Sequence, residues 1–135
     1  LARSASGTVT IEGATIATLT AQQVYTKPQI ATVTALTSSS NATAIALLTS
    51  NDYSHTTTEA TTLSNPSDTP VAGQSGSIFI TQAAGANYTL AFGSEYDFAG
   101  GTAPTITAAN AARDRLDYVV RADGKIEITA VLNLS

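Results

Sequence analysis

The sequence predicts an all-β protein, specifically an antiparallel β-sandwich or jelly-roll-like domain with a β-rich N-terminal arm. Three observations support this prediction. Short segments that alternate apolar and polar residues recur at spacings of roughly ten residues, as in β-sandwiches. Threonine is abundant, and its β-branched side chain fits a pleated, half-buried surface. Clusters of glycine, proline, asparagine and serine separate the alternating segments and indicate turns.

A shift in composition near residue 40 divides the 135-residue chain into an arm and a domain. The arm is rich in alanine and threonine, alternates in segments 8–20 and 30–36, and contains Tyr25 as its only aromatic residue. An apolar arm of this kind can pair with a neighbouring subunit's sheet by strand addition. We therefore predict an assembly arm over residues 1–40 and a β-sandwich domain over residues 41–135.

Within the first half of the predicted domain, length and polarity decide between strand and loop. The apolar run 44–49 has the length of a buried strand, whereas the polar segment 50–58 is predicted as a turn. Residues 59–64 are predicted as a strand that stops at the proline-containing segment 65–73, which is predicted as a loop.

The second half of the domain shows two hairpin patterns. Residues 77–82 and 88–92 alternate on either side of a short turn, which predicts one hairpin. Residues 116–120 and 125–135 flank the dipeptide Asp123-Gly124, which is the strongest short hairpin signal in the chain. Both hairpins predict antiparallel pairing.

The low charge of the chain excludes some classes of partner. Charged residues make up only 12 % of the chain, about half the usual share of roughly 25 %. A net charge of −4 argues against binding to nucleic acid, which requires clustered lysine and arginine. No apolar run approaches the roughly 18 residues of a membrane-spanning helix, so no membrane partner is expected. So few charges suit a protein whose faces pack against other subunits.

Two sets of residues are candidates for catalysis or metal binding. His55, the only histidine, lies in a polar segment without a nucleophile-elbow motif, so a solvated loop residue is favoured over a member of a catalytic triad. Glu95 and Asp97 flank Tyr96 and could bind Ca²⁺ or act on glycosidic bonds if a suitable geometry surrounded them. Nothing nearby completes a ligand set, and a polar strand edge is favoured. We expect no catalytic residue, no metal and no cofactor.

Two further patterns are compatible with contacts or with modification. Arg113, Asp114, Arg115 and Asp117 form a mixed charge cluster that predicts either a subunit contact or ordinary surface ion pairs. Asn41 and Asn87 start N-glycosylation triplets, but such triplets arise readily in a threonine-rich sequence and matter only in a eukaryotic secretory route.

The second half of the chain carries a series of motifs in a fixed order. These are Gly73-Gln74-Ser75-Gly76, a strand ending at Thr81-Gln82, the turn Phe92-Gly93-Ser94, the stretch Phe98-Ala99-Gly100-Gly101-Thr102-Ala103-Pro104, and Asp114 with Tyr118 before the last hairpin. This order resembles a β-rich C-terminal module of tailed-bacteriophage virion proteins, of the head-fibre, tail-fibre or decoration type. The resemblance covers a little over half the chain, and its most specific part is the stretch 98–104. Phe92 departs from the pattern, because relatives often carry tryptophan there.

The resemblance implies a location on the virion surface and a homo-oligomer, often a homotrimer, with no catalytic residue. A capsid decoration (cement) protein or short head fibre is favoured by the short chain, and its partners would include other virion proteins such as the major capsid protein. The alternatives are a receptor-binding tail-fibre tip, with a host surface glycan as its partner, and a glycan-binding or glycan-cleaving module.

Aromatic residues and glycines in the module are the predicted site residues. We expect a core or subunit-interface position for Phe79, Tyr88, Phe92, Tyr96, Phe98 and Tyr118. Three glycines are expected in turns that need positive φ or close approach, namely Gly93, Gly100 and Gly101.

Overall fold

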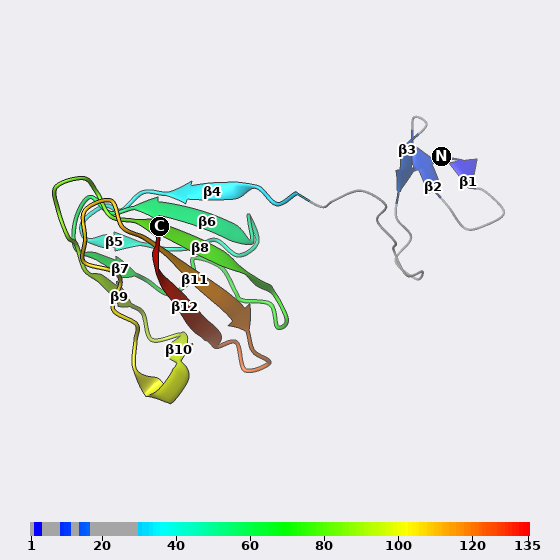
Figure 1. Ribbon diagram of the computed structural model, residues 1–135. Coiled ribbons are helices and arrows are strands. Elements are labelled where there is room, and N and C mark those ends of the chain that lie inside the picture. Colours follow the sequence, from blue (N-terminus) through cyan, green and yellow to red (C-terminus); the bar gives the residue numbers. More distant parts are fainter. Residues whose placement is uncertain (1, 4–8, 12–13, 17–29) are drawn as a thin grey trace. The chain divides into compact units, whose positions relative to one another are not determined.

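The structure, a computed structural model, describes residues 2–3, 9–11, 14–16 and 30–135 (Figure 1). Its backbone contacts divide the chain into two compact units, residues 1–30 and 31–135, which are described separately. This division lies ten residues before the shift in composition near residue 40. The reason is strand β4 (Val33–Leu36), which is hydrogen-bonded to a strand of the second unit.

The first unit contains a small antiparallel sheet. Its strands are β1 (Ala2–Arg3), β2 (Val9–Ile11) and β3 (Ala14–Ile16), in that spatial order. The prediction of a β-rich N-terminal segment agrees with these strands, which are the described part of the unit.

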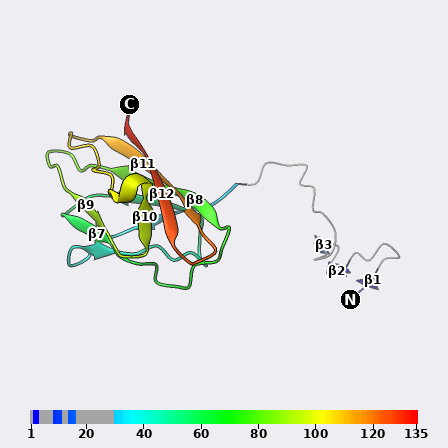
Figure 2. The same ribbon diagram turned by 90° about the horizontal axis from the view of Figure 1, so that it is seen from below.

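The second unit is all-β and sandwich-like, which confirms the predicted fold class. A six-stranded sheet has the spatial order β10-β12-β11-β8-β6-β4, and a three-stranded sheet has the order β5-β7-β9 (Figures 1 and 2). The remaining strands are β5 (Ala42–Thr43), β6 (Asp52–Thr56), β7 (Thr61–Leu63), β8 (Ser75–Thr81), β9 (Leu90–Phe92), β10 (Tyr96–Phe98), β11 (Arg113–Val120) and β12 (Ile126–Leu134). A single 3₁₀ turn follows β10 at Ala99–Gly101. The described residues include no helix with the length and hydropathy needed to cross a membrane.

From β4 to β9 the chain alternates between the two sheets at every step. Each return places a strand parallel to the previous strand of the same sheet: Val33 pairs with Asp52 and Asp52 with Ser77, while Ala42 pairs with Thr62. The chain therefore winds around a common core. The predicted antiparallel pairing was wrong for this part and for β10 with β12, and it holds within the unit for β8 with β11 and β11 with β12.

The predicted hairpin over 77–82 and 88–92 was also wrong, because β8 and β9 belong to different sheets. The side chain of Gln82 explains why the chain crosses over instead of turning back. Its Oε1 accepts hydrogen bonds from Thr57 Oγ1 and from Tyr88 N, and its Nε2 donates to Tyr88 O. A buried amide thus supplies the partners that a neighbouring strand would otherwise supply.

The other local predictions have mixed outcomes. The strand in 59–64 is confirmed as β7, and the Asp123-Gly124 hairpin is confirmed by the antiparallel pair β11–β12, with Gly124 at φ +81°. The segment 50–58 contains β6 and is not a turn. The run 44–49 contains no strand, although Ile45 and Leu47 are buried.

The core lies between the two sheets and contains three buried tyrosines. The apolar residues around them are Ile45, Leu47, Leu63, Ile78, Ile80, Ile106, Leu116, Val120, Ile126 and Ile128. Each tyrosine hydroxyl donates to the backbone of a segment that crosses between the sheets. Tyr53 Oη reaches Ala46 O and Ser50 O, both at 2.6 Å. Tyr118 Oη reaches Asn51 O at 2.8 Å, and Tyr96 Oη reaches Ser64 O at 3.1 Å.

The segment 46–51 crosses from β5 to β6, and side chains of other segments hold it with hydrogen bonds. The carboxylate of Asp68 accepts hydrogen bonds from Leu47 N and Leu48 N, each at 2.8 Å. Gln74 Nε2 donates to Leu47 O at 2.6 Å and to Asn51 Oδ1 at 2.8 Å. Gly76 lies against Asn51 O so closely that a Cβ at this position would overlap it. A side chain at residue 76 would therefore displace the crossing segment.

The buried tyrosines make folding stability sensitive to high pH. Burial is the main cause that raises the pKa of Tyr53, Tyr96 and Tyr118 in the folded protein. Unfolded tyrosine ionises near pH 10, so above that pH the folded state binds more protons than the unfolded state. The stabilisation is complete below about pH 10 and is lost as the pH rises through the folded-state pKa values, by up to about 1.4 kcal/mol per pH unit for each tyrosine.

Urea unfolding between about pH 9 and about pH 11 measures this effect. We expect the unfolding free energy of the wild type to fall across the range, and Tyr118→Phe to show a shallower fall because one ionising group is gone. A wild-type stability that stays constant over this range would contradict the account.

Candidate interaction surface

The six-stranded sheet has one face in the core and one face turned away from it. Alternation along each strand defines the second face, which we call the outer face. Its residues are Val33 and Ala35 of β4, Asp52, Ser54 and Thr56 of β6, Ser75, Ser77, Phe79 and Thr81 of β8, Asp97 of β10, Arg113, Arg115, Asp117 and Val119 of β11, and Glu127, Thr129 and Val131 of β12. Their neighbours along each strand point into the core.

Three large apolar side chains of the outer face are exposed. Phe79 is 40 % exposed, Val119 48 % and Val33 49 %. Phe79 lies near the middle of the face, between Ser54 of β6 and Arg115 of β11 in the sheet register. Large apolar groups at the centre of an uncovered sheet are a feature of contact surfaces.

The charges on the outer face are separated by sign along the strands. Arg113 and Arg115 occupy the first two outward positions of β11, and Asp117 follows them. Asp52 lies in the same cross-strand row as Asp117, since both pair with Ser77. Glu127 lies one row further, between Val119 and Asp97, and Asp97 is paired with Arg121. The face therefore has a basic end and an acidic end.

Hydrogen bonds hold the middle of this charge pattern in place. Arg115 Nε and a carboxylate oxygen of Asp117 are 2.9 Å apart, and Ser77 Oγ donates to Asp117 Oδ1 at 2.7 Å. Ser77 N donates to Asp52 Oδ1 at 3.0 Å. A shallow hollow of about 220 Å³ lies at the acidic end and is lined by Asp117, Tyr118, Val119, Glu127 and Thr129.

The aromatic residues that the sequence offered for the core or for an interface fall into different environments. Tyr96 and Tyr118 are buried in the core. Phe92 is partly buried, and its ring packs edge-to-face on Tyr96 at 5.9 Å and on the partly buried Phe98 at 4.9 Å between ring centroids. Tyr88 is half-buried, and its backbone binds Gln82. Phe79 is the member of the set that lies on the outer face.

The three glycines occupy two kinds of position. Gly100 and Gly101 have φ of +67° and +71°, which residues with a Cβ rarely adopt. Gly93 lies directly against Asn65, and a Cβ there would overlap the Asn65 side chain. Asn65 Oδ1 also accepts a hydrogen bond from Glu95 N, so this close approach fixes the turn before β10.

His55 is not the solvated loop residue that the sequence favoured. It lies in β6 with only 2 % of its surface exposed. Nδ1 is 3.1 Å from Leu36 O, and because a carbonyl can only accept, Nδ1 carries the proton. Nε2 is buried and has no hydrogen-bond partner among the described residues. The described contacts of the ring include no serine and no carboxylate, so they form no catalytic triad.

Glu95 and Asp97 do not form a joint site. Asp97 pairs with Arg121 at 3.0 Å, and Arg121 also pairs with Asp123 at 2.6 Å. A hydrogen bond from Lys125 N, together with Arg121, holds the pKa of Asp123 below its ordinary value. Across residues 2–3, 9–11, 14–16 and 30–135, no group of three or more histidine, cysteine, aspartate or glutamate side chains is placed to hold a metal ion.

The mixed cluster 113–117 separates into a buried and an exposed part. Asp114 is buried and accepts hydrogen bonds from Thr107 N at 2.6 Å, Thr107 Oγ1 at 2.7 Å and Asn133 N at 2.8 Å. It therefore fixes the segment before β11 to the end of β12. The two arginines and Asp117 lie on the outer face.

The two candidate glycosylation residues also differ. Asn41 Nδ2 donates to Ala60 O at 2.8 Å, so this side chain helps to join the turn before β5 to the segment before β7. Asn87 is exposed.

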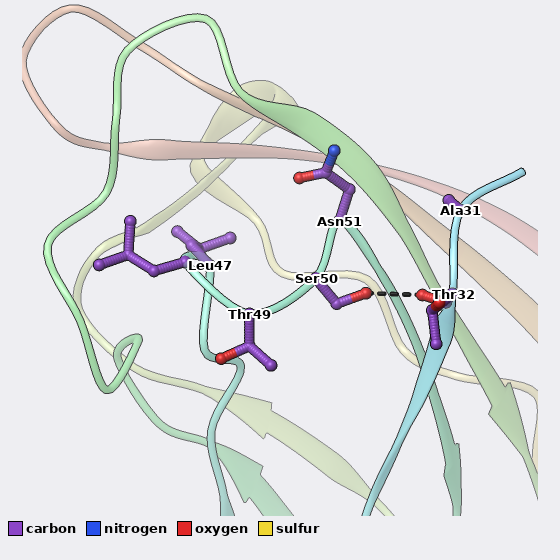
Figure 3. Close-up of a pocket in the computed structure, with 7 residues that line it drawn as sticks. Ala31, Thr32, Leu47, Thr49, Ser50 and Asn51 are labelled. Atoms are coloured by element: carbon purple, nitrogen blue, oxygen red, sulfur yellow. Dashed lines mark hydrogen bonds between the residues drawn. The ribbon is translucent and has the colours of Figure 1, made fainter. Parts of the chain in front are cut away.

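A second hollow, of about 280 Å³, lies between the crossing segment 46–51 and the residues that enter β4 (Figure 3). Its lining is uncharged and consists of Ala31, Thr32, Leu47, Leu48, Thr49, Ser50 and Asn51. Ser50 Oγ donates to Thr32 O at 2.6 Å and closes one side of it. Several of the lining groups serve to hold the crossing segment, so we assign the hollow a structural origin.

Comparisons with known proteins add no relative. A scan against family models, a search of curated proteins and a search of solved structures each return no match.

Proposed function

We propose that this chain is a structural protein on the surface of a tailed-bacteriophage particle, a capsid decoration (cement) protein or a short head fibre. The observation that carries the proposal is the outer face, where the exposed apolar side chains of Val33, Phe79 and Val119 lie among polar and charged residues. Such a face is suited to contacts with other virion proteins, such as the major capsid protein. The resemblance of residues 63–135 to virion modules supports the same proposal.

The side chains considered for chemistry have structural partners that support a non-enzymatic role. His55 is bonded to the backbone of β4, and Asp97 is paired with Arg121. These groups stabilise the fold, and the proposed function needs no cofactor.

Locating the chain in intact particles tests the proposal. We expect electron microscopy of purified particles to show density for this chain in a regular array on the capsid. Density on the tail tip alone would contradict the capsid assignment and favour a receptor-binding tip. Particles that lack the chain by mass spectrometry would contradict a virion function. Cleavage of bacterial polysaccharide by the purified protein, abolished by Glu95→Gln or Asp97→Asn, would favour the glycan-cleaving alternative instead.

We also propose that the chain forms a homotrimer. Multi-angle light scattering should then give three times the chain mass of 13.7 kDa. The physical reason is that exposed groups such as Phe79 and Val119 become buried on association. A monodisperse monomer in solution, with no symmetric contacts between copies on the particle, would contradict this expectation.

A further inference from the structure

We infer that copies of this chain contact one another through the outer face, with the basic end of one copy against the acidic end of the next. This inference rests on the proposed homo-oligomer and specifies which surface forms it and in which orientation. The apolar groups in the middle of the face would supply the buried area, and the charges at the two ends would set the relative orientation.

The two ends are well separated on a single strand. Arg113 and Val119 are both outward residues of β11, and Glu127 lies opposite Val119 on β12. Six residues of a β-strand span about 20 Å, so Arg113 and Glu127 lie about that far apart. This separation exceeds the screening length of roughly 8 Å in physiological salt. The two groups therefore act on a partner independently.

The charged side chains near the two ends differ in whether they have a partner within the described residues. In residues 31–135, Arg121 binds Asp97 and Asp123, and Lys125 Nζ binds Ser94 O, so both are engaged at the last hairpin. Arg115 pairs with Asp117 through its Nε. Arg113 is exposed and forms no ion pair within the described residues, and the same holds for Glu127. Arg113 and Glu127 thus remain available for a contact with another molecule.

Charge complementarity points to a second copy as the partner. A partner must present carboxylates to Arg113 and a basic group to Glu127, and the outer face itself presents both. Two copies stacked with like ends together would bring two acidic ends into contact, which is unfavourable. Rotation or displacement that sets opposite ends together removes this repulsion. A half-turn that lays the two faces fully on each other is isologous and gives a dimer, whereas a displaced contact that joins the basic end of one copy to the acidic end of the next is heterologous and, where it closes after three copies, gives the proposed trimer.

Reversal and exchange of the two free charges tests the contact. We expect Arg113→Glu alone and Glu127→Arg alone each to weaken association of the full chain by about tenfold or more. The double variant Arg113→Glu/Glu127→Arg should recover association to near the wild-type value, because every contact again joins opposite charges. Light scattering over a dilution series measures the association constant, and thermal unfolding verifies that each variant is folded.

Two control variants separate this contact from general effects. Lys125→Glu makes the same change in net charge as Arg113→Glu but lies two residues before Glu127, at the acidic end, so it should not weaken association. Phe79→Ser should weaken association because it removes apolar area from the middle of the face. Leu48→Ser should not, since Leu48 is 73 % exposed but lies on the crossing segment.

The outcomes of these experiments test the outer-face contact separately from the oligomer proposal and the virion proposal. If both single reversals associate like the wild type, or if the double variant stays as weak as the single variants, the outer-face contact is wrong while a wild-type trimer still stands. If the wild type itself is monomeric at all concentrations and on the particle, the oligomer proposal fails as well. The virion proposal depends on neither result, because it is tested by the location of the chain on particles.

Discussion

The fold depends on the hydrogen bonds that buried tyrosine hydroxyls donate to the segments crossing between the sheets. A chain that changes sheets at every step leaves carbonyl groups near the core that no neighbouring strand can satisfy, and unsatisfied buried carbonyls are costly. Tyr53 and Tyr118 reach the segment between β5 and β6, and Tyr96 reaches the segment between β7 and β8. A phenylalanine would fill the same space but could not donate these hydrogen bonds. Parallel winding and buried tyrosine are therefore linked in this domain.

The outer face follows from the same construction. Because the chain repeatedly returns to the six-stranded sheet, each return adds one strand with one row of side chains inward and one row outward. The inward rows are filled by residues such as Ile78, Leu116 and Ile126. The outward rows receive Phe79, Val119 and the charges, and the described elements of the second unit leave them accessible. The buried core and the accessible outer face thus both follow from the alternation of inward and outward side chains along each strand.

The sequence was informative about strands and much less informative about their partners. Alternation identified β8, the second half of β11 and β12, because an inward apolar residue recurs at every second position in 78–80, 116–120 and 126–130. It missed β6, whose inward positions are Tyr53 and the polar His55, and it assigned a strand to 44–49 because burial of Ile45 and Leu47 looks the same in a crossing segment. Parallel pairing joins residues 19 to 30 positions apart, such as Val33 with Asp52 and Tyr96 with Ile126, and no local pattern encodes it.

The outer face also could not be predicted from local sequence patterns alone. Each of its residues is visible in the sequence, and the charge cluster 113–117 was considered for a subunit contact. However, the separation of the basic and acidic ends exists only after β11 and β12 are placed in register, because Glu127 is brought beside Val119 by that pairing. The aromatic residues could be assigned to core or interface as a group, whereas only the register shows that Phe79 points outward. The fold class could be predicted from the sequence, whereas the contact surface could be recognised only once the strands were paired in the sheet.

Phe79 is accessible in the isolated chain, and in the proposed assembly a second copy of the chain covers it. The chain contains no cysteine, so Phe79→Cys introduces a single thiol at the centre of the outer face. The most direct measurement is the rate at which a maleimide labels this thiol in assembled and in dissociated protein. The account predicts labelling at least about tenfold slower in the assembly, corresponding to a covered site. Equal rates in the two states, with the assembly intact, would contradict it.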